Sequence, residues 1–164
     1  MAHRRGSVLR ASAPKGDFVL PPGDNPVVLV AAGVGITPFA PMLYTLAGGH
    51  RRVALVHCVR DDAHYPLREE LTELAQTSPN IELHTCYSRA TPGDYSTAGS
   101  QAFGGRVDAT ALQRLLPGLF DNADWLLCGP TGFMASISEG LEGLGVPISR
   151  IHRESFATHS AREK

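Results

Sequence analysis

Two short turns hold the residues of this sequence whose types and spacing suit the binding of a phosphate group. The first follows an unbroken run of small and β-branched apolar residues over 27–32 and reads Gly33-Val34-Gly35-Ile36-Thr37-Pro38. Glycines in such a turn let the backbone approach a pyrophosphate closely, and the free amides at the start of the next helix attract its charge. Thr37 is a candidate N-cap of that helix, and Pro38 suits its first position. Glycine turns also occur for structural reasons alone, so this pattern by itself leaves both interpretations open.

The second turn ends another apolar, strand-like run and reads Cys128-Gly129-Pro130. A helix is predicted after it, with inward-facing apolar residues at Phe133, Met134, Ile137 and Leu141. In an open α/β sheet, ligands bind beyond the carboxyl ends of the strands, where the direction of winding reverses. The two turns are therefore expected to face each other across one crevice. Taken alone, a cysteine such as Cys128 at the end of an apolar strand is typical of a small buried hydrophobic residue.

Strand-like and helix-like segments alternate along the rest of the chain. Strands are predicted over 27–32, 51–59, 81–87, 124–128 and 149–156, and helices over 38–47, 66–76, 108–116 and 131–145. This alternation predicts an α/β fold with a five-stranded parallel sheet and helices on both faces. Asp108 is a candidate N-cap, and the second helix is expected to turn Leu67, Leu71 and Leu74 inward. The segment 88–105 is predicted to be a long loop, of a length that is usually functional.

The chain divides into one main domain and short flanking segments. Residues 1–22 are too few to form a domain, and their alternation of apolar and polar residues predicts a half-buried antiparallel hairpin over 6–22. Residues 23–26 form a stiff linker that ends in proline. The main domain is predicted over 27–156, and the polar tail over 157–164 is expected to fray.

The composition narrows the classes of function. The 164 residues are 43% hydrophobic with a formal net charge of −1, which favours a folded domain and gives no general attraction to nucleic acid or membranes. The three cysteines are far apart and the histidines form no i,i+4 pair, so no disulfide framework or metal site is indicated. We therefore expect a cytoplasmic protein with no membrane span, no metal and no nucleic-acid partner.

The first turn, with proline in its sixth position, resembles the G-x-G-x-x-P turn of the ferredoxin-NADP reductase superfamily, which includes flavohaemoglobins and the reductases of oxygenases. The resemblance extends from Gly6 to Phe156 and includes the C-G-P turn, Phe133-Met134 behind it, and the terminal motif Glu154-Ser155-Phe156. It implies the strand order 3-2-1-4-5, and it implies that the residues of both turns, together with Phe133 and Met134, bind the coenzyme. It also implies that residues 1–22 are the remnant of a flavin-binding β-barrel, whose body and R-x-Y-[ST] motif are not in the sequence.

The same resemblance implies roles for three candidate catalytic residues. Cys128 would lie beside the nicotinamide ring, the Thr37 hydroxyl near the nicotinamide and flavin, and Glu154 close to the reacting rings. Phe156 would cover a face of the flavin. From the residues alone, other interpretations stay open: Thr37 as a helix cap, Glu154 as a solvated carboxylate and Phe156 as a core aromatic.

The choice between NADH and NADPH depends on how the adenosine ribose is bound. Ordinary dinucleotide folds use an acid after the second strand, here Asp61 or Asp62, to bind the free ribose hydroxyls. The superfamily instead implies that this end is bound after the third strand, by Ser88-Arg89, with Tyr95 stacked on the adenine. Arg89 would clamp a 2′-phosphate with its planar guanidinium, although an ordinary solvated arginine fits the sequence equally well. This comparison favours NADPH.

Together these features indicate the NAD(P)H-binding domain of a flavin-dependent oxidoreductase. Hydride would pass from NAD(P)H to FAD, which a flavin-binding domain would hold in cis or in trans. Electrons would then reach a haem, an iron–sulfur centre or another acceptor. The alternative is a non-catalytic nucleotide-binding or regulatory fragment that needs a flavin-domain partner.

Overall fold

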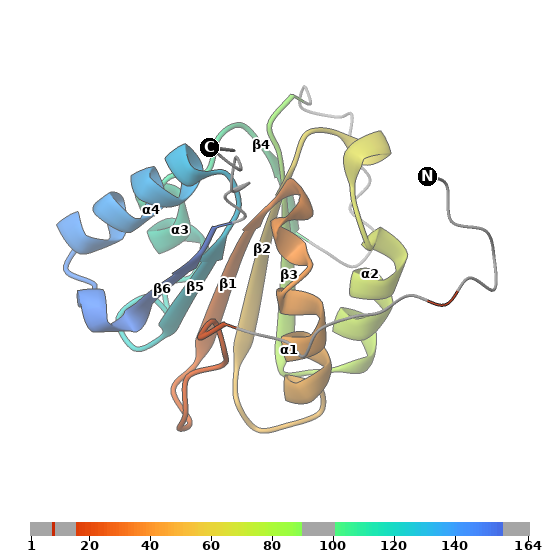
Figure 1. Ribbon diagram of the computed structural model, residues 1–164, viewed down its shortest axis with the longest axis horizontal. Helices are drawn as coiled ribbons and strands as arrows, with labels where there is room; N and C mark the ends of the chain where they lie inside the picture. The colour runs from red at the N-terminus through yellow and green to blue at the C-terminus, as the bar shows by residue number, and fades with distance from the viewer. Residues whose placement is uncertain (1–7, 9–15, 90–100, 156–164) are drawn as a thin grey trace.

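Six parallel strands form one sheet (Figure 1) in the computed structural model, which describes Val8, residues 16–89 and residues 101–155. The strands are β1 (Val27–Ala32), β2 (Val53–Val59), β3 (Ile81–Tyr87), β4 (Gln101–Gly104), β5 (Asp124–Cys128) and β6 (Ile151–Glu154). They lie side by side in the order β4-β3-β2-β1-β5-β6. The five strands predicted from the sequence are all present, and among themselves they have the predicted order 3-2-1-4-5.

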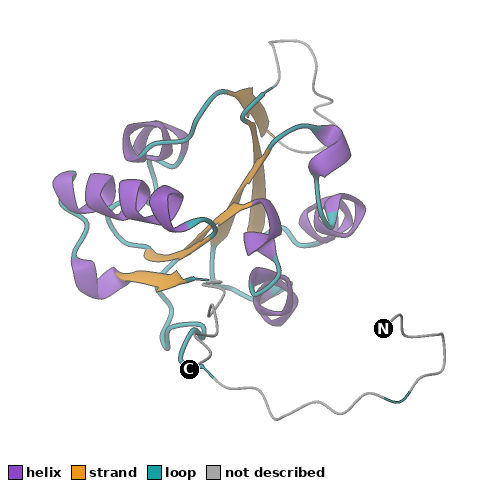
Figure 2. Ribbon diagram, turned by 45° about the horizontal axis from the view of Figure 1, so that its top comes forward, coloured by secondary structure: helices purple, strands orange, loops and turns teal. Residues whose placement is uncertain are grey.

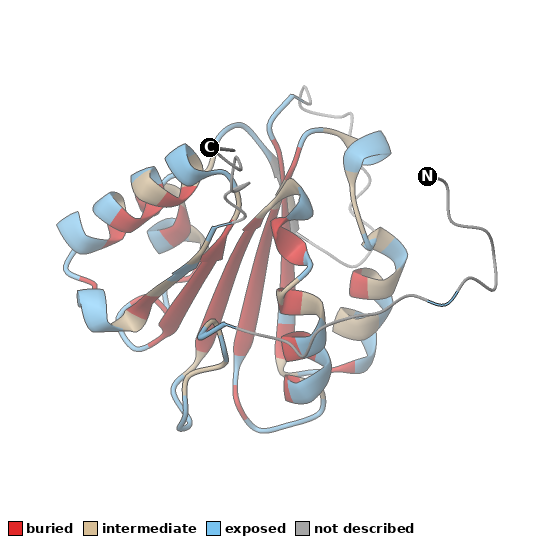
Figure 3. Ribbon diagram, in the orientation of Figure 1, coloured by how far each residue is buried: buried red, intermediate tan, exposed pale blue. Residues whose placement is uncertain are grey.

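Helices cover both faces of the sheet (Figure 2), as the alternating pattern predicts. They are α1 (Phe39–Leu46), α2 (Arg68–Thr77), α3 (Ala109–Leu115) and α4 (Thr131–Gly143). Successive residues of a strand point to opposite faces. In β1, Val27 and Leu29 pack on the side of α1 and α2, whereas Val28 and Val30 pack on the side of α3 and α4. The strand is buried on both faces (Figure 3), which explains its unbroken apolar sequence.

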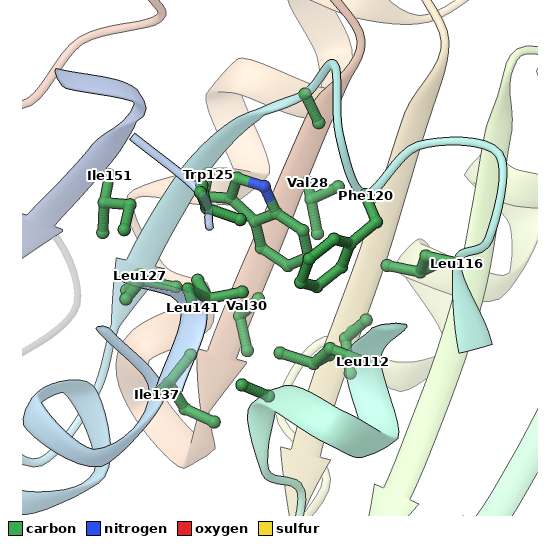
Figure 4. Packing of buried hydrophobic residues seen from close by; sticks show 14 of the residues in the cluster. Val28, Val30, Leu112, Leu116, Phe120, Trp125, Leu127, Ile137, Leu141 and Ile151 are labelled. Carbon is green, nitrogen blue, oxygen red and sulfur yellow. The ribbon is translucent and has the colours of Figure 1, made fainter. Parts of the chain in front are cut away.

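Trp125 anchors the core on the side of α3 and α4 (Figure 4). Its fully buried ring meets the ring of Phe120 edge-on, with the centroids 5.4 Å apart. Leu112 of α3 and both Ile137 and Leu141 of α4 belong to the same cluster. This packing fixes α4 against β5, so the first turn of α4 stays beside the carboxyl end of that strand.

The strand β4 lies inside the segment that the sequence predicted as a loop. It pairs in parallel with the end of β3, from His84 opposite Gln101 to Tyr87 opposite Gly104. The pairing satisfies backbone groups that β3 would otherwise expose as an edge strand. Four residues are too few for a period of two to be recognised, which is why the sequence pattern did not indicate it.

Of the predictions made for the helix starts, the Asp108 cap is confirmed, whereas the Thr37 cap and the inward-facing Leu67 are wrong. Asp108 caps α3, and its carboxylate accepts a hydrogen bond from the Ala111 amide at 2.7 Å. Thr37 does not cap α1, because its own backbone is already helical and its hydroxyl donates to the Val34 carbonyl at 3.0 Å. Leu67 does not face inward: it precedes α2 with a left-handed backbone (φ 59°), and 37% of it is exposed.

The segment before β1 contains no strand over residues 16–22, so this part of the predicted hairpin is wrong. Phe18 and Leu20 pack instead against the core on the side of α1, and the Phe18 ring centroid lies 5.8 Å from that of Phe39. The rest of the predicted hairpin and the tail over 157–164 lie outside the described residues. Within the described ranges, none of the helices has the length and apolar character needed to cross a membrane.

Candidate functional site

The two glycine turns meet at the carboxyl ends of β1 and β5, which are paired neighbours at the centre of the sheet. A Cβ atom added to Gly35 would lie 2.2 Å from the carbonyl oxygen of Cys128. A Cβ added to Gly129 would lie 2.9 Å from the Cβ of Ala32. Both distances are too short for any side chain, so the turns can approach this closely only because these positions are glycine.

Gly33 serves the same turn in another way. Its φ of +54° lies in the left-handed region that side chains disfavour. From Gly33 to Ile36 the chain forms a short 3-10 helix, η1 (Gly33–Ile36), which bends over the end of β1 and leads into α1. The first turn therefore needs both of its glycines: Gly33 allows the bend through its positive φ, and Gly35 allows the close approach to the second turn.

The side chain of His57, on β2, stabilises the first turn through a hydrogen bond. Its Nε2 lies 3.1 Å from the Gly33 carbonyl oxygen, and the ring of Tyr65 meets the imidazole edge-on at 5.0 Å. Burial lowers the pKa of His57 to about 4, and the hydrogen bond to Gly33 opposes this shift only in part. The imidazole is therefore neutral at pH 7, with Nε2–H donating to Gly33.

This environment predicts a pH-dependent stability. The unfolded chain takes up a proton at His57 near its ordinary pKa of 6.5, whereas the folded chain resists protonation until about 4. The neutral His57 imidazole therefore contributes its full share of the folding stability above pH 6.5, and this contribution is lost as the pH falls toward 4. Between about pH 7 and about pH 5, His57 is expected to remove about 2 kcal/mol from the free energy of unfolding.

The measurement is urea unfolding of the wild type and of His57→Gln at several pH values in this range. Glutamine keeps an N–H donor for Gly33 but does not titrate, so the variant is expected to show the shallower pH dependence. Equal slopes in the two proteins would contradict the assignment. Comparison of slopes also removes the contribution of the other titrating groups, which both proteins share.

A cavity of about 800 Å³ opens over the carboxyl ends of the central strands. Six of the residues predicted to bind a cofactor line it: Gly33, Val34, Ser88, Gly129, Pro130 and Phe133. The ionisable side chains in its wall include Arg60, His64 and Arg106, and no carboxylate is among the described residues that line it. A cavity of this size with glycine turns and cationic side chains suits an anionic ligand.

The other predicted binding residues do not line this cavity. Gly35, Ile36, Cys128 and Met134 are buried beneath the two turns, and Pro38 is half-buried where α1 begins. Thr37 and Arg89 are exposed. Arg89 is the second residue after β3, and its amide donates to the Arg60 carbonyl at 3.2 Å. Tyr95 and Phe156 lie outside the described residues, and their predicted roles stay predictions.

Two of the predicted catalytic residues are neighbours across β5 and β6. Cys128 pairs directly with Glu154 in the sheet register. Burial, and to a smaller degree the carboxylate of Glu154, raises the pKa of the Cys128 thiol to about 11. Cys128 is therefore a neutral, fully buried thiol at physiological pH and is suited to packing in the core, not to nucleophilic attack.

The acids that follow β2 are engaged in local contacts. The carboxylate of Asp61 contacts Nδ1 of His64 at 2.6 Å, and that of Asp62 accepts a hydrogen bond from Tyr87 at 2.6 Å. Asp62 also pairs with Arg68 at 3.1 Å. Neither acid lines the cavity, so neither occupies the position from which an ordinary dinucleotide fold binds the ribose hydroxyls.

Two cavity arginines were missed by the sequence predictions. Arg60 directly follows β2, so its place at the carboxyl end of a predicted strand was a usable signal. Arg106 follows β4, and without that strand no sequence signal places Arg106 near the site. In the described part of the chain, no three histidine, cysteine or acidic side chains come together as metal ligands.

The model of the oxidoreductase NAD-binding domain family matches residues 29–139. This chain belongs to that family. The matched residues run from β1 into α4, so they include both glycine turns of the NAD-binding domain and the cavity between them. The superfamily identified from the two turns is thereby confirmed.

Relatives of this NAD-binding domain are larger proteins. The flavohemoprotein of Chromobacterium violaceum is 38% identical over 156 residues, which are 94% of this chain and 38% of that protein. The flavohem-like FAD/NAD-binding domain of a nitric oxide dioxygenase from Vibrio cholerae has a TM-score of 0.72 at 30% identity, covering 88% of this chain and 56% of that one. A flavohemoglobin of Malassezia yamatoensis, solved with FAD and heme, has a TM-score of 0.72 at 31% identity. The match covers 86% of this chain and 35% of that one.

Proposed function

We propose that this NAD-binding domain binds NAD(P)H in the cavity and presents its nicotinamide to a flavin held by another domain. One observation carries the proposal: a single cavity joins both glycine turns, has two arginine side chains in its wall and has no carboxylate among its described lining residues. When bound, the dihydronicotinamide supplies a hydride and the flavin accepts it. The protein's own contribution is to bind, orient and exclude competing reactions.

The pyrophosphate is assigned to the space between the two turns. Gly33 and Gly129 leave room for a close approach, and the N-terminal ends of η1 and α4 direct positive partial charge toward it. Arg60 and Arg106 add full positive charges to the wall. Cys128 and Glu154, together with Thr37, are assigned to the nicotinamide end, where the neutral Cys128 thiol lies buried beneath the second turn and supports it.

We further propose that NADPH is preferred over NADH. A ribose 2′-phosphate is favoured by the cationic wall, and no acid lies among the described lining residues to repel it. Ser88 also lines the cavity, and it precedes Arg89, which the sequence predicts as the phosphate clamp. Since Arg60 and Arg106 line the cavity and Arg89 does not, the first two are the stronger candidates.

The test is a calorimetric titration with NADPH and, separately, NADH. Arg60→Ala and Arg106→Ala are each expected to weaken NADPH binding about tenfold, which is about 1.4 kcal/mol. Arg114→Ala is the matched control, because Arg114 is an exposed arginine of α3 that does not line the cavity. Arg89→Ala in the same series decides between the two assignments of the clamp. Failure of the wild type to bind either nucleotide would overturn the proposed function.

The flavin domain is proposed to lie in the same chain or in a partner protein, with a haem as the acceptor that the relatives favour. This part of the proposal is tested by adding a separately produced flavin domain, with FAD, to the NAD-binding domain. NADPH-dependent reduction of the flavin, followed by its absorbance, is the expected result. Nucleotide binding without reduction would instead favour a regulatory nucleotide-binding role.

A further inference from the structure

Two thiols lie side by side in the wall of the nucleotide cavity, and the proposed function uses neither of them. Cys58 of β2 pairs directly with Cys86 of β3 in the sheet register, and both residues line the cavity. Directly paired residues of parallel strands point to the same face, and neighbouring strands lie about 4.7–4.9 Å apart. That spacing falls within the range of about 4.4–6.8 Å between the Cα atoms of a disulfide.

The two sulfur atoms already interact. The side chains of Cys58 and Cys86 are hydrogen-bonded to each other, and the backbone amide of Val107 also donates to Cys86. In the thiol form, Cys86 donates to the Gly105 carbonyl at 2.9 Å. The sulfur of Cys86 is therefore held in a fixed position against its neighbour.

The contacts between Cys58 and Cys86 shift the pKa values of the two thiols in opposite directions. The hydrogen bond from Cys58 lowers the pKa of Cys86, and it raises the pKa of Cys58 well above its usual range. Cys86 is therefore the thiol that ionises first and attacks an oxidant, while Cys58 keeps its proton. Cys86 is only 1% exposed, and the cavity that both residues line gives a small reagent access to them.

We propose that Cys58 and Cys86 form a reversible intrachain disulfide on reaction with a small peroxide, and that a bound dinucleotide prevents this reaction. The Cys86 thiol loses its proton, and the thiolate attacks one oxygen of hydrogen peroxide, which leaves a sulfenic acid on Cys86 and expels the other oxygen as hydroxide. This hydroxide takes up the proton that Cys86 lost and becomes the first water. The sulfur of Cys58 then attacks the sulfenic sulfur, forms the S–S bond and expels hydroxide, which takes up the Cys58 proton as a second water. The two thiols supply both electrons, and a dithiol restores the reduced pair by exchange.

The third cysteine has no part in this reaction. Cys128 is fully buried on β5, which β1 separates from β2. Its side chain belongs to the core on the opposite face of the sheet from Cys58. Cys128 therefore serves as an internal reference for thiol counting in the same molecule.

The disulfide is tested by peroxide treatment, labelling of the remaining thiols in denaturant and mass spectrometry. The wild type is expected to fall from three labelled thiols to one, with peptides linked through Cys58 and Cys86, and dithiothreitol should restore all three. Cys58→Ser and Cys58→Ala are expected to form no such link and to accumulate a dimedone-reactive sulfenic acid on Cys86, while Cys128→Ser still forms the link. Circular dichroism confirms that each variant is folded. Three free thiols after treatment of the wild type, or a link through Cys128, would overturn the proposal.

The protection by nucleotide rests on the proposed function, but the disulfide does not. NADP⁺ is used because it does not reduce peroxide, and at saturation it is expected to slow the loss of thiols at least about tenfold through the coupling of two events at one cavity. If calorimetry detects bound NADP⁺ and the rate is unchanged, the shared cavity is refuted. If NADP⁺ does not bind and the disulfide still forms, the proposed function fails and the dithiol assignment stands.

Discussion

Replacement of Arg51 by methionine is expected to lower the free energy of unfolding by about 3–5 kcal/mol. The guanidinium group lies 3.1 Å from the carboxylate of Asp124, and each side chain is only 8% exposed. Removing the arginine leaves a buried carboxylate without its partner, which costs more than the pair contributes. Arg51 also donates to the carbonyls of Pro21 and Asn25, so its loss releases the segment that precedes β1.

The neighbouring arginine provides a matched control for this prediction. Arg52 pairs with Glu82 at 3.0 Å, but these side chains are 56% and 48% exposed. Arg52→Met is therefore expected to cost no more than about 1 kcal/mol. Urea unfolding at pH 7 measures both variants, and a double variant with Arg51→Met and Asp124→Asn should recover part of the loss because no charge stays buried. Equal losses for the two single variants would contradict the role of the buried pair.

The central architecture could be predicted because its strands carry local signals. β1 is apolar throughout and β5 is apolar after Asp124, since both faces of these strands are covered, and a glycine follows each strand. The close contact of the two turns requires the glycines at positions 35 and 129. The order of the strands came from the resemblance that these turns carry. The adjacency of Cys128 and Glu154 follows from the same order, because β5 and β6 are neighbours.

What the sequence did not reveal depends on contacts between distant residues. Arg51 and Asp124 are 73 positions apart, and neither residue type indicates burial. The pairing of Cys58 with Cys86 requires the register of β2 and β3, which hydrophobic patterns do not give when both faces are apolar. Thr37 satisfied every local criterion for a cap, but the preceding η1 turn had already made its backbone helical.

Gly35→Ala is expected to disrupt the site more than any other single methyl group added to the turns. The new Cβ would lie 2.2 Å from the carbonyl oxygen of Cys128, which is backbone and cannot rotate away. Either η1 or the end of β5 must shift. We therefore expect the free energy of unfolding to fall by about 3 kcal/mol, which is the upper end of the usual range for substitutions that overpack a core. Because the shift moves both glycine turns apart, NADP⁺ affinity is expected to fall at least about tenfold, or about 1.4 kcal/mol.

Gly143→Ala separates this effect from the general consequences of replacing a glycine. Gly143 ends α4, is exposed and has no atom within 4 Å of an added Cβ, so the change is expected to be neutral or to stabilise by about 0.4–1 kcal/mol. Urea unfolding and calorimetric titration of both variants give the comparison. If Gly35→Ala retained wild-type affinity for NADP⁺ despite a stability loss, the close contact of the turns would serve folding alone, and the pyrophosphate would have to be bound elsewhere.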